Sequence, residues 1–235
     1  MDRFELLEVI TLPVANSPDF RSCAFDGEFY YFTSTRERAV YKFTRGFFPA
    51  GYAKTAESYT GICYDSTDGC FWASVENHHP AIHRLDSEFR HVGVIDIMGV
   101  PSGPDESSMQ IMGISYDAEN DLLLVAFEHC VCTVCKKSGR AQVLLEAGED
   151  GFAGVLSLPP YYAVIPQNRR EIRFYANGGC VPWRIKTPQN YMILDTLPYP
   201  LREQSGRIPE LLALAAKRGE RVLVLVYDLN GLALL

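Results

Sequence analysis

Short apolar runs alternate with polar turns along most of the chain, and the alternation repeats. Each copy opens with a large apolar residue followed closely by a small one, continues as an apolar run, turns, and returns as a second apolar run. The four copies are Phe20–Asp26 with Phe29–Phe32, Tyr59–Asp65 with Cys70–Ala73, Ile111–Asp117 with Leu122–Ala126, and a weaker Phe152–Leu158 with Tyr161–Ile165. Repeats of about 20–50 residues are typical of arrays whose units bury their apolar faces against one another.

Each copy continues with a third and a fourth strand. The third strands are expected at Ala39–Phe43, Ala81–Leu85, Cys130–Val134 and Glu171–Tyr175, and the fourth at Phe47–Ala53, Val92–Ile97, Ala141–Leu145 and Val181–Lys186. Short strands joined by polar, glycine-containing turns predict an antiparallel meander. Four strands in roughly 40–50 residues is the size of one blade of a β-propeller.

The third copy, Gly113-Ile-Ser-Tyr-Asp117 followed by Leu122-Leu-Leu-Val-Ala126, resembles the loose repeat of YVTN- and NHL-type β-propeller proteins. The resemblance extends over most of the chain and implies a fold. It does not imply a specific family or an activity.

A fifth blade is expected from the two ends of the chain. The C-terminal part of the chain offers three strands, at Leu211–Ala215, Arg221–Val226 and a short Leu232–Leu235. The fourth strand of this blade can come from Glu5–Leu12 at the N-terminal end. Pro209 to Gly219 also has the pattern of a capped helix, so local propensity and the repeat disagree there. The repeat favours strand, because an N-terminal strand in the last blade closes the ring and removes exposed edges.

The sequence therefore predicts a single all-β domain, a five-bladed propeller of four-stranded antiparallel blades. The expected blades cover about 14–57, 58–108, 109–149, 150–198, and 199–235 together with 1–13.

The amino-acid composition limits the classes of partner and the cellular location that can be expected. Hydrophobic residues make up 47% and charged residues 22% of the 235 residues, as in folded globular proteins. A net charge of −7 argues against nucleic acid, and no apolar stretch approaches the roughly 20 residues of a membrane span. Seven cysteines, mostly inside apolar runs, suit buried free thiols in a reducing compartment, so a cytoplasmic location is expected.

One position near the propeller axis stands out within the repeat. Ser22, Gly61, Gly113 and Gly154 occupy it in the first four blades, and crowding of the backbone explains such small residues. The fifth blade is expected to place Glu210 there. A lone carboxylate beside the axis would be desolvated and a candidate for function.

A second candidate region is the face carrying the loops into the inner strands and the loops between the second and third strands. Loops on a rigid scaffold often carry function, and two of these loops, Met98–Gln110 and Pro188–Arg207, are long. With Glu210, the candidate ligand-binding residues are Glu76, His78, His79, Glu128, His129, Arg169, Arg170 and Asp228.

Two clusters contain residue types that bind metals, but their spacing is unfavourable. Adjacent histidines such as His78 and His79 point to opposite sides of an extended segment, so at most one could readily join His129. Cys130 and Cys132 share one strand face and Cys135 projects from the other, so the three thiolates do not converge. No metal or cofactor is predicted.

No nucleophile elbow, phosphate-binding loop, dinucleotide fingerprint or zinc-protease motif occurs in the sequence. The expected function is therefore a binding or scaffold module that recognises an unknown small molecule or protein through its polar loops. The alternative is a hydrolase or lyase with an axial carboxylate or a metal-assisted site.

Overall fold

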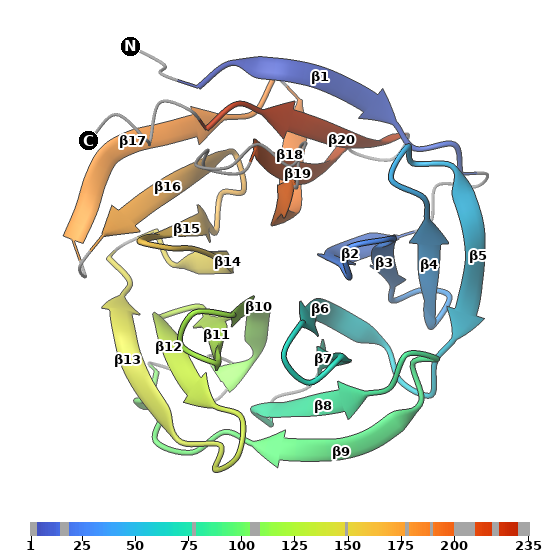
Figure 1. The fold of residues 1–235 in the computed structure, drawn as a ribbon. Coiled ribbons are helices and arrows are strands. Elements are labelled where there is room, and N and C mark those ends of the chain that lie inside the picture. The colour runs from blue at the N-terminus through green and yellow to red at the C-terminus, as the bar shows by residue number, and fades with distance from the viewer. Residues whose placement is uncertain are drawn as a thin grey trace.

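The computed structural model describes residues 4–14, 19–76, 79–103, 109–148, 150–176, 179–188, 190–199, 210–217 and 221–229. Their strands form five antiparallel sheets of four strands each, arranged as blades around a central axis (Figure 1). This is the predicted five-bladed propeller.

Blades one to four follow the chain, each running from the axis outward. The first blade consists of β2 (Phe20–Phe25), β3 (Tyr30–Ser34), β4 (Ala39–Phe43) and β5 (Pro49–Lys54). The second consists of β6 (Tyr59–Asp65), β7 (Cys70–Val75), β8 (Ala81–Leu85) and β9 (His91–Asp96). The third consists of β10 (Ile111–Asp117), β11 (Leu122–Phe127), β12 (Cys130–Cys135) and β13 (Ala141–Glu146). The fourth consists of β14 (Phe152–Leu158), β15 (Tyr161–Pro166), β16 (Glu171–Ala176) and β17 (Gly179–Lys186).

The fifth blade joins the two ends of the chain. Its order from the axis outward is β18 (Tyr191–Tyr199), β19 (Glu210–Lys217), β20 (Arg221–Tyr227) and β1 (Leu6–Thr11). The N-terminal strand thus closes the ring, as predicted. Residues 210–217 are a strand, so the repeat prevails over the local helix propensity.

The inner strand of this blade corrects the sequence prediction. Leu211–Ala215 was expected at the axis, but β19 is the second strand and β18 is the inner one. The loop expected at Pro188–Arg207 therefore contains a strand, and the fifth blade begins before β18, not at residue 199. Leu232–Leu235 lies outside the described residues.

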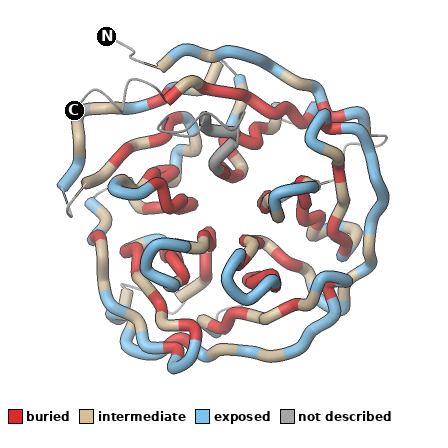
Figure 2. The backbone as a smooth tube through the Cα atoms, viewed as in Figure 1, coloured by how far each residue is buried: buried red, intermediate tan, exposed pale blue. Residues whose placement is uncertain are grey.

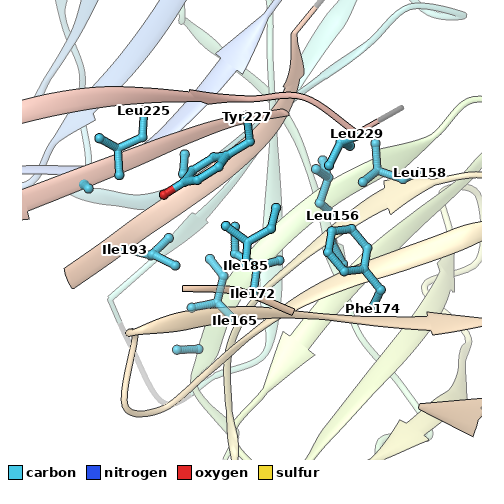
Figure 3. Packing of buried hydrophobic residues seen from close by; sticks show 14 of the residues in the cluster. Leu156, Leu158, Ile165, Ile172, Phe174, Ile185, Ile193, Leu225, Tyr227 and Leu229 are labelled. Atoms are coloured by element: carbon cyan, nitrogen blue, oxygen red, sulfur yellow. The ribbon is translucent and has the colours of Figure 1, made fainter. Parts of the chain in front are cut away.

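The inner and second strands of the blades are mostly buried, whereas the outer strands at the rim of the ring are mostly exposed or half-buried (Figure 2). Every residue of β3 and β7 is buried, whereas most residues of the outer strand β5 are exposed. Apolar side chains fill the space between neighbouring blades. Between blades four and five, for example, Leu156, Phe174 and Ile185 share one cluster with Ile193 and Leu225 (Figure 3). Blade-on-blade packing is thus what buries the apolar faces that the repeat predicts.

Within the described parts of the chain, no helix is long and apolar enough to cross a membrane.

Candidate functional site at the axis

All five inner strands have an irregularity of register at the same place, one residue before the position nearest the axis. The pairing shifts just before Ser22, Gly61, Gly113, Gly154 and Asp195. These five residues are the waist of the propeller. Because β18 takes the inner place, Asp195, not Glu210, is the carboxylate at the axial position of blade five.

The waist is tightly packed, as the crowding argument predicts. A Cβ added at Gly113 would lie 2.8 Å from the Cα of Gly154 in the neighbouring blade. At Gly61 an added Cβ would lie 2.6 Å from the Ser74 hydroxyl oxygen. Real Cβ atoms essentially never approach other atoms so closely. The glycines are therefore required by close contact between strands.

Asp195 is 7% exposed and links blade five to blade one. Its Oδ2 accepts hydrogen bonds from the Ser22 hydroxyl and from the Cys23 amide at 3.0 Å, and its Oδ1 accepts one from the Thr196 amide at 2.8 Å. The Ser22 oxygen in turn accepts the Ile62 amide at 3.0 Å, which extends the link to blade two. Burial raises the pKa of Asp195 to about 6, although these donors and Arg169 act to lower it.

Above the waist lies a cavity of about 140 Å³, here called the loop-face cavity. It opens on the face that carries the loops into the inner strands. Residues from all five blades line it: Arg21, Thr60, Glu76, Gln110, Ile111, Met112, Arg169 and Leu194. It is therefore formed only when the ring is complete.

Arg169 contributes a half-buried guanidinium group to the wall of this cavity. Its Nη1 donates to the carbonyl oxygens of Ile193 and Leu194 at 3.4 and 3.2 Å, and its own carbonyl accepts the Ile193 amide at 2.7 Å. Burial lowers the pKa of Arg169, Asp195 acts in the opposite direction, and the nearby charge of Arg21 lowers it further. The guanidinium remains charged, because arginine starts from a pKa above 12.

Below the waist is a larger cavity of about 280 Å³, here called the turn-face cavity. It lies toward the turns between the first and second strands. Residues from all five inner strands line it, and no charged side chain is among them.

The loops grouped by sequence do lie on one face. The Phe152 amide at the start of β14 donates to the Glu128 carbonyl of the neighbouring loop, and Ile193 of β18 contacts Arg169 in the same way. Of the predicted site residues, the structure brings Glu76 and Arg169 together in the loop-face cavity. Glu128 and Arg170 are exposed on that face, outside the cavity lining.

Two predicted residues lie on the opposite face. β19 begins and β20 ends at the turn face, because Glu210 pairs with Tyr199 and the next described pair joins Leu211 to Tyr227. Asp228 therefore does not belong to the predicted loop face, and Glu210, which was predicted beside the axis, lies instead at the turn-face start of the second strand. The cause is the misassigned inner strand, which shifted every later element of the blade by one place.

The described histidines do not form a metal site. His79 Nε2 is 3.0 Å from Asp96 Oδ1, whereas His129 Nε2 is 2.9 Å from the Pro101 carbonyl oxygen. His78 lies outside the described residues. Among those that are described, no group of three or more potential ligands includes a histidine.

The described residues do contain one group of potential ligands, Asp65, Asp68 and Cys70. The Lys136 ammonium lies 2.6 Å from Asp65 Oδ2 and 3.5 Å from Asp68 Oδ2, and it also pairs with Asp121. A cation is already supplied by the protein, so this cluster joins blades two and three and does not fit a metal ion. The buried sulfur atoms of Cys130 and Cys132 are 3.7 Å apart inside the core, as the packing interpretation of that strand expects.

Comparison of the fold with solved structures finds other proteins of this architecture. A glutaminyl cyclase from Myxococcus xanthus superposes with a TM-score of 0.67 at 8% identity, covering 96% of both chains. A hydrazine synthase from Kuenenia stuttgartiensis superposes with a TM-score of 0.53 at 11% identity, covering 88% of this chain and 66% of the other. At these identities the similarity concerns the fold alone. No family model and no curated protein matches the sequence.

Sequence reasoning missed Asp195 and Arg21. The signal for Asp195 was present: Ile193 precedes it by two residues, just as Phe20 precedes Ser22 and Ile111 precedes Gly113. An acidic residue in place of the small one hid the fifth copy. No sequence pattern singles out Arg21, because its place in the cavity lining depends on the curvature that brings the inner strands together.

Proposed function

We propose that this protein binds a small amphoteric molecule, one carrying both a carboxylate and an amine, in the loop-face cavity. The observation that carries the proposal is the place of Arg169, a half-buried guanidinium in the wall of a cavity to which all five blades contribute. Ligand pockets typically combine a preformed cavity with a few convergent polar groups.

Arg169 favours an anionic group on the ligand. It forms no ion pair with a described carboxylate, and its described hydrogen bonds run from Nη1 to two neutral carbonyl oxygens. A guanidinium has five N–H donors in a planar fork that matches the two oxygens of a carboxylate. Arg21 adds a second positive charge to the lining, although its side chain also pairs with Asp19 at 3.0 Å.

Glu76 favours an amine on the same ligand. It is the single carboxylate among the described lining residues, and it comes from blade two, whereas the two arginines come from blades one and four. Thr60 and Gln110 add uncharged hydrogen-bonding groups. At about 140 Å³, the cavity suits a molecule the size of an amino acid.

A thermal-shift screen of the free amino acids, followed by calorimetry on those that stabilise the protein, tests the proposal. Arg169→Met should weaken binding about 10- to 150-fold, the equivalent of about 1.5–3 kcal/mol for a hydrogen bond to a charged group. Arg170→Met is the matched control, because Arg170 is exposed in the same loop and outside the cavity lining. Equal affinities for the two variants would refute the assignment.

Ligand analogues separate the two charges. In the wild type, converting the carboxylate to an amide or acetylating the amine should each weaken binding. Glu76→Gln should remove the discrimination against the acetylated analogue, whereas Glu128→Gln, the corresponding change in the next blade, should leave it intact. If Glu76→Gln discriminates as well as the wild type does, the amine lies elsewhere.

A second candidate function is an enzyme that uses Asp195 as a general acid or base. The favouring observation is its pKa of about 6, close to the operating range of acid–base catalysts, at the axial position. The similarly folded Myxococcus xanthus protein is by name an enzyme, a glutaminyl cyclase, so the architecture is compatible with catalysis. Turnover that Asp195→Asn abolishes while leaving ligand affinity unchanged would favour this function over simple binding.

A further inference from the structure

The turn-face cavity differs from the loop-face cavity in its chemistry. Its lining is contributed by inner-strand residues of every blade: Cys23, Ala24, Phe25, Ile62, Cys63, Tyr64, Ile114, Ser115, Tyr116, Leu156, Ser157, Thr196 and Leu197. None of these side chains carries a charge at neutral pH. Apolar and aromatic groups dominate, and a few hydroxyl and thiol groups are interspersed.

The charged groups near this cavity either already interact with other protein groups or, like Asp195, would repel an anion. Lys136 lies beyond Tyr116 and is held by Asp65 at 2.6 Å. The Tyr116 hydroxyl donates to Asp121 at 2.8 Å, so it is occupied as well. Asp195 at the waist is an acid, and when ionised it would repel a negatively charged occupant. The one described positive charge close to the lining without a carboxylate partner is Arg45. Its guanidinium lies 5.8 Å from the centre of the Phe25 ring, donates to the Gly27 carbonyl oxygen and is exposed, so solvent screens its charge.

Two buried hydroxyl groups in the wall have unused hydrogen-bonding capacity. Ser157 and Thr196 are 6% and 3% exposed, and their side-chain oxygens have no partner among the described residues. They come from neighbouring blades, and both residues line the cavity. An unsatisfied buried hydroxyl costs free energy, and rotation about χ1 can turn it toward an occupant that supplies a partner.

We propose that the turn-face cavity is a second binding site, for an uncharged aromatic molecule of about two rings with one hydrogen-bonding group. An engineered apolar cavity of about 150 Å³ in another protein binds benzene. The turn-face cavity, at about 280 Å³, has nearly twice that volume. The site lies on the opposite side of the waist from Arg169 and goes beyond the amphoteric ligand proposed above.

Calorimetric titration with indole tests this site, with indole-3-acetate as the charged match. Indole should bind saturably, and indole-3-acetate at least about tenfold more weakly, because burying an unpaired carboxylate is costly. Ala24→Leu, which places a larger side chain at a residue of the lining, should abolish indole binding. Ala53→Leu is the matched control on the outer strand β5, and it should bind indole like the wild type.

The double variant Ser157→Ala/Thr196→Val removes both hydroxyls at nearly constant volume. It should weaken indole binding about 2- to 10-fold, the effect expected for a single neutral hydrogen bond. Urea unfolding of every variant verifies that the ring is intact. Absence of saturable indole binding by the folded wild type, equal binding by Ala24→Leu, or tighter binding of indole-3-acetate than of indole would each overturn the proposal. Unchanged affinity in the double variant would overturn the role of the hydroxyls.

Discussion

The stability of the propeller should fall as pH rises from about 4 to about 6, through the ionisation of Asp195. Its pKa is about 6 in the folded protein, against an ordinary value of 3.8. In this interval the folded state binds more protons than the unfolded state, so raising the pH favours unfolding. A difference of about 2 units at about 1.4 kcal/mol each amounts to about 3 kcal/mol. The contribution is greatest below pH 3.8 and is lost above pH 6.

Asp195→Asn isolates this effect. The asparagine oxygen can still accept from Ser22 and Cys23, but its amide group then faces the Thr196 N–H, so one hydrogen bond is lost at every pH. That loss, about 1 kcal/mol, is a constant offset. The pH-dependent part is the difference between wild type and variant. It should shift by about 2.5 kcal/mol in favour of the variant between pH 4 and pH 7, because part of the unfolded-state titration lies below pH 4.

Urea unfolding at half-unit pH intervals measures this difference, with equal m-values as the check that only stability has changed. Glu28→Gln, which neutralises an exposed carboxylate, is the control variant for the removal of one negative charge. A flat curve for Asp195→Asn would refute the raised pKa. A curve of opposite sign would mean that hydrogen bonding outweighs burial at this carboxylate.

Two further substitutions test the contacts that hold the blades together. Lys136→Met leaves the fully buried Asp65 carboxylate without its cation, and removing one partner of a buried pair costs about 3–5 kcal/mol of stability. Urea unfolding should show this loss. The control, Lys137→Met at the exposed neighbouring position, should stay within about 0.5 kcal/mol of wild type. Gly113→Ala should destabilise the ring by about 1–3 kcal/mol, because the added Cβ would lie 2.8 Å from a backbone atom of the next blade. Thermal unfolding should show no such loss for the control, Gly148→Ala, where nothing lies within 4 Å of the added Cβ. If Lys137→Met and Gly148→Ala lose as much stability as Lys136→Met and Gly113→Ala, respectively, the assigned contacts between blades are wrong.

The strands of blades one to four could be predicted because each blade buries the same face in the same way. A large residue such as Phe20 or Tyr59 packs between blades, and a small residue two places later fits the crowded waist. Both requirements leave a trace in local sequence. The fifth blade departs from the pattern at Asp195, and its inner strand ends in Pro198 and Tyr199, which suggest a turn when no partner strand is in view.

The candidate site was only partly predictable. Glu76 and Arg169 could be placed on the loop face, because strand order alone decides which loops share a face. Their convergence in one cavity could not be predicted, since it depends on the lengths and paths of loops from different blades. Lys136 was missed because its partners, Asp65 at the end of β6 and Asp121 in a turn, both adjoin polar turns that look solvent-exposed in sequence. They meet only when blades two and three pack together.

The most direct test of the loop-face site is the side-chain NMR signal of Arg169. In protein labelled with ¹⁵N-arginine, its Nε–H resonance is assigned by its disappearance in Arg169→Lys and followed while the amino acid that stabilises the protein most is added. Binding at Arg169 should produce a saturable shift of this resonance, with little change at Arg170. A saturable ligand that leaves the Arg169 resonance in place would contradict the central claim, because the carboxylate would then be bound elsewhere.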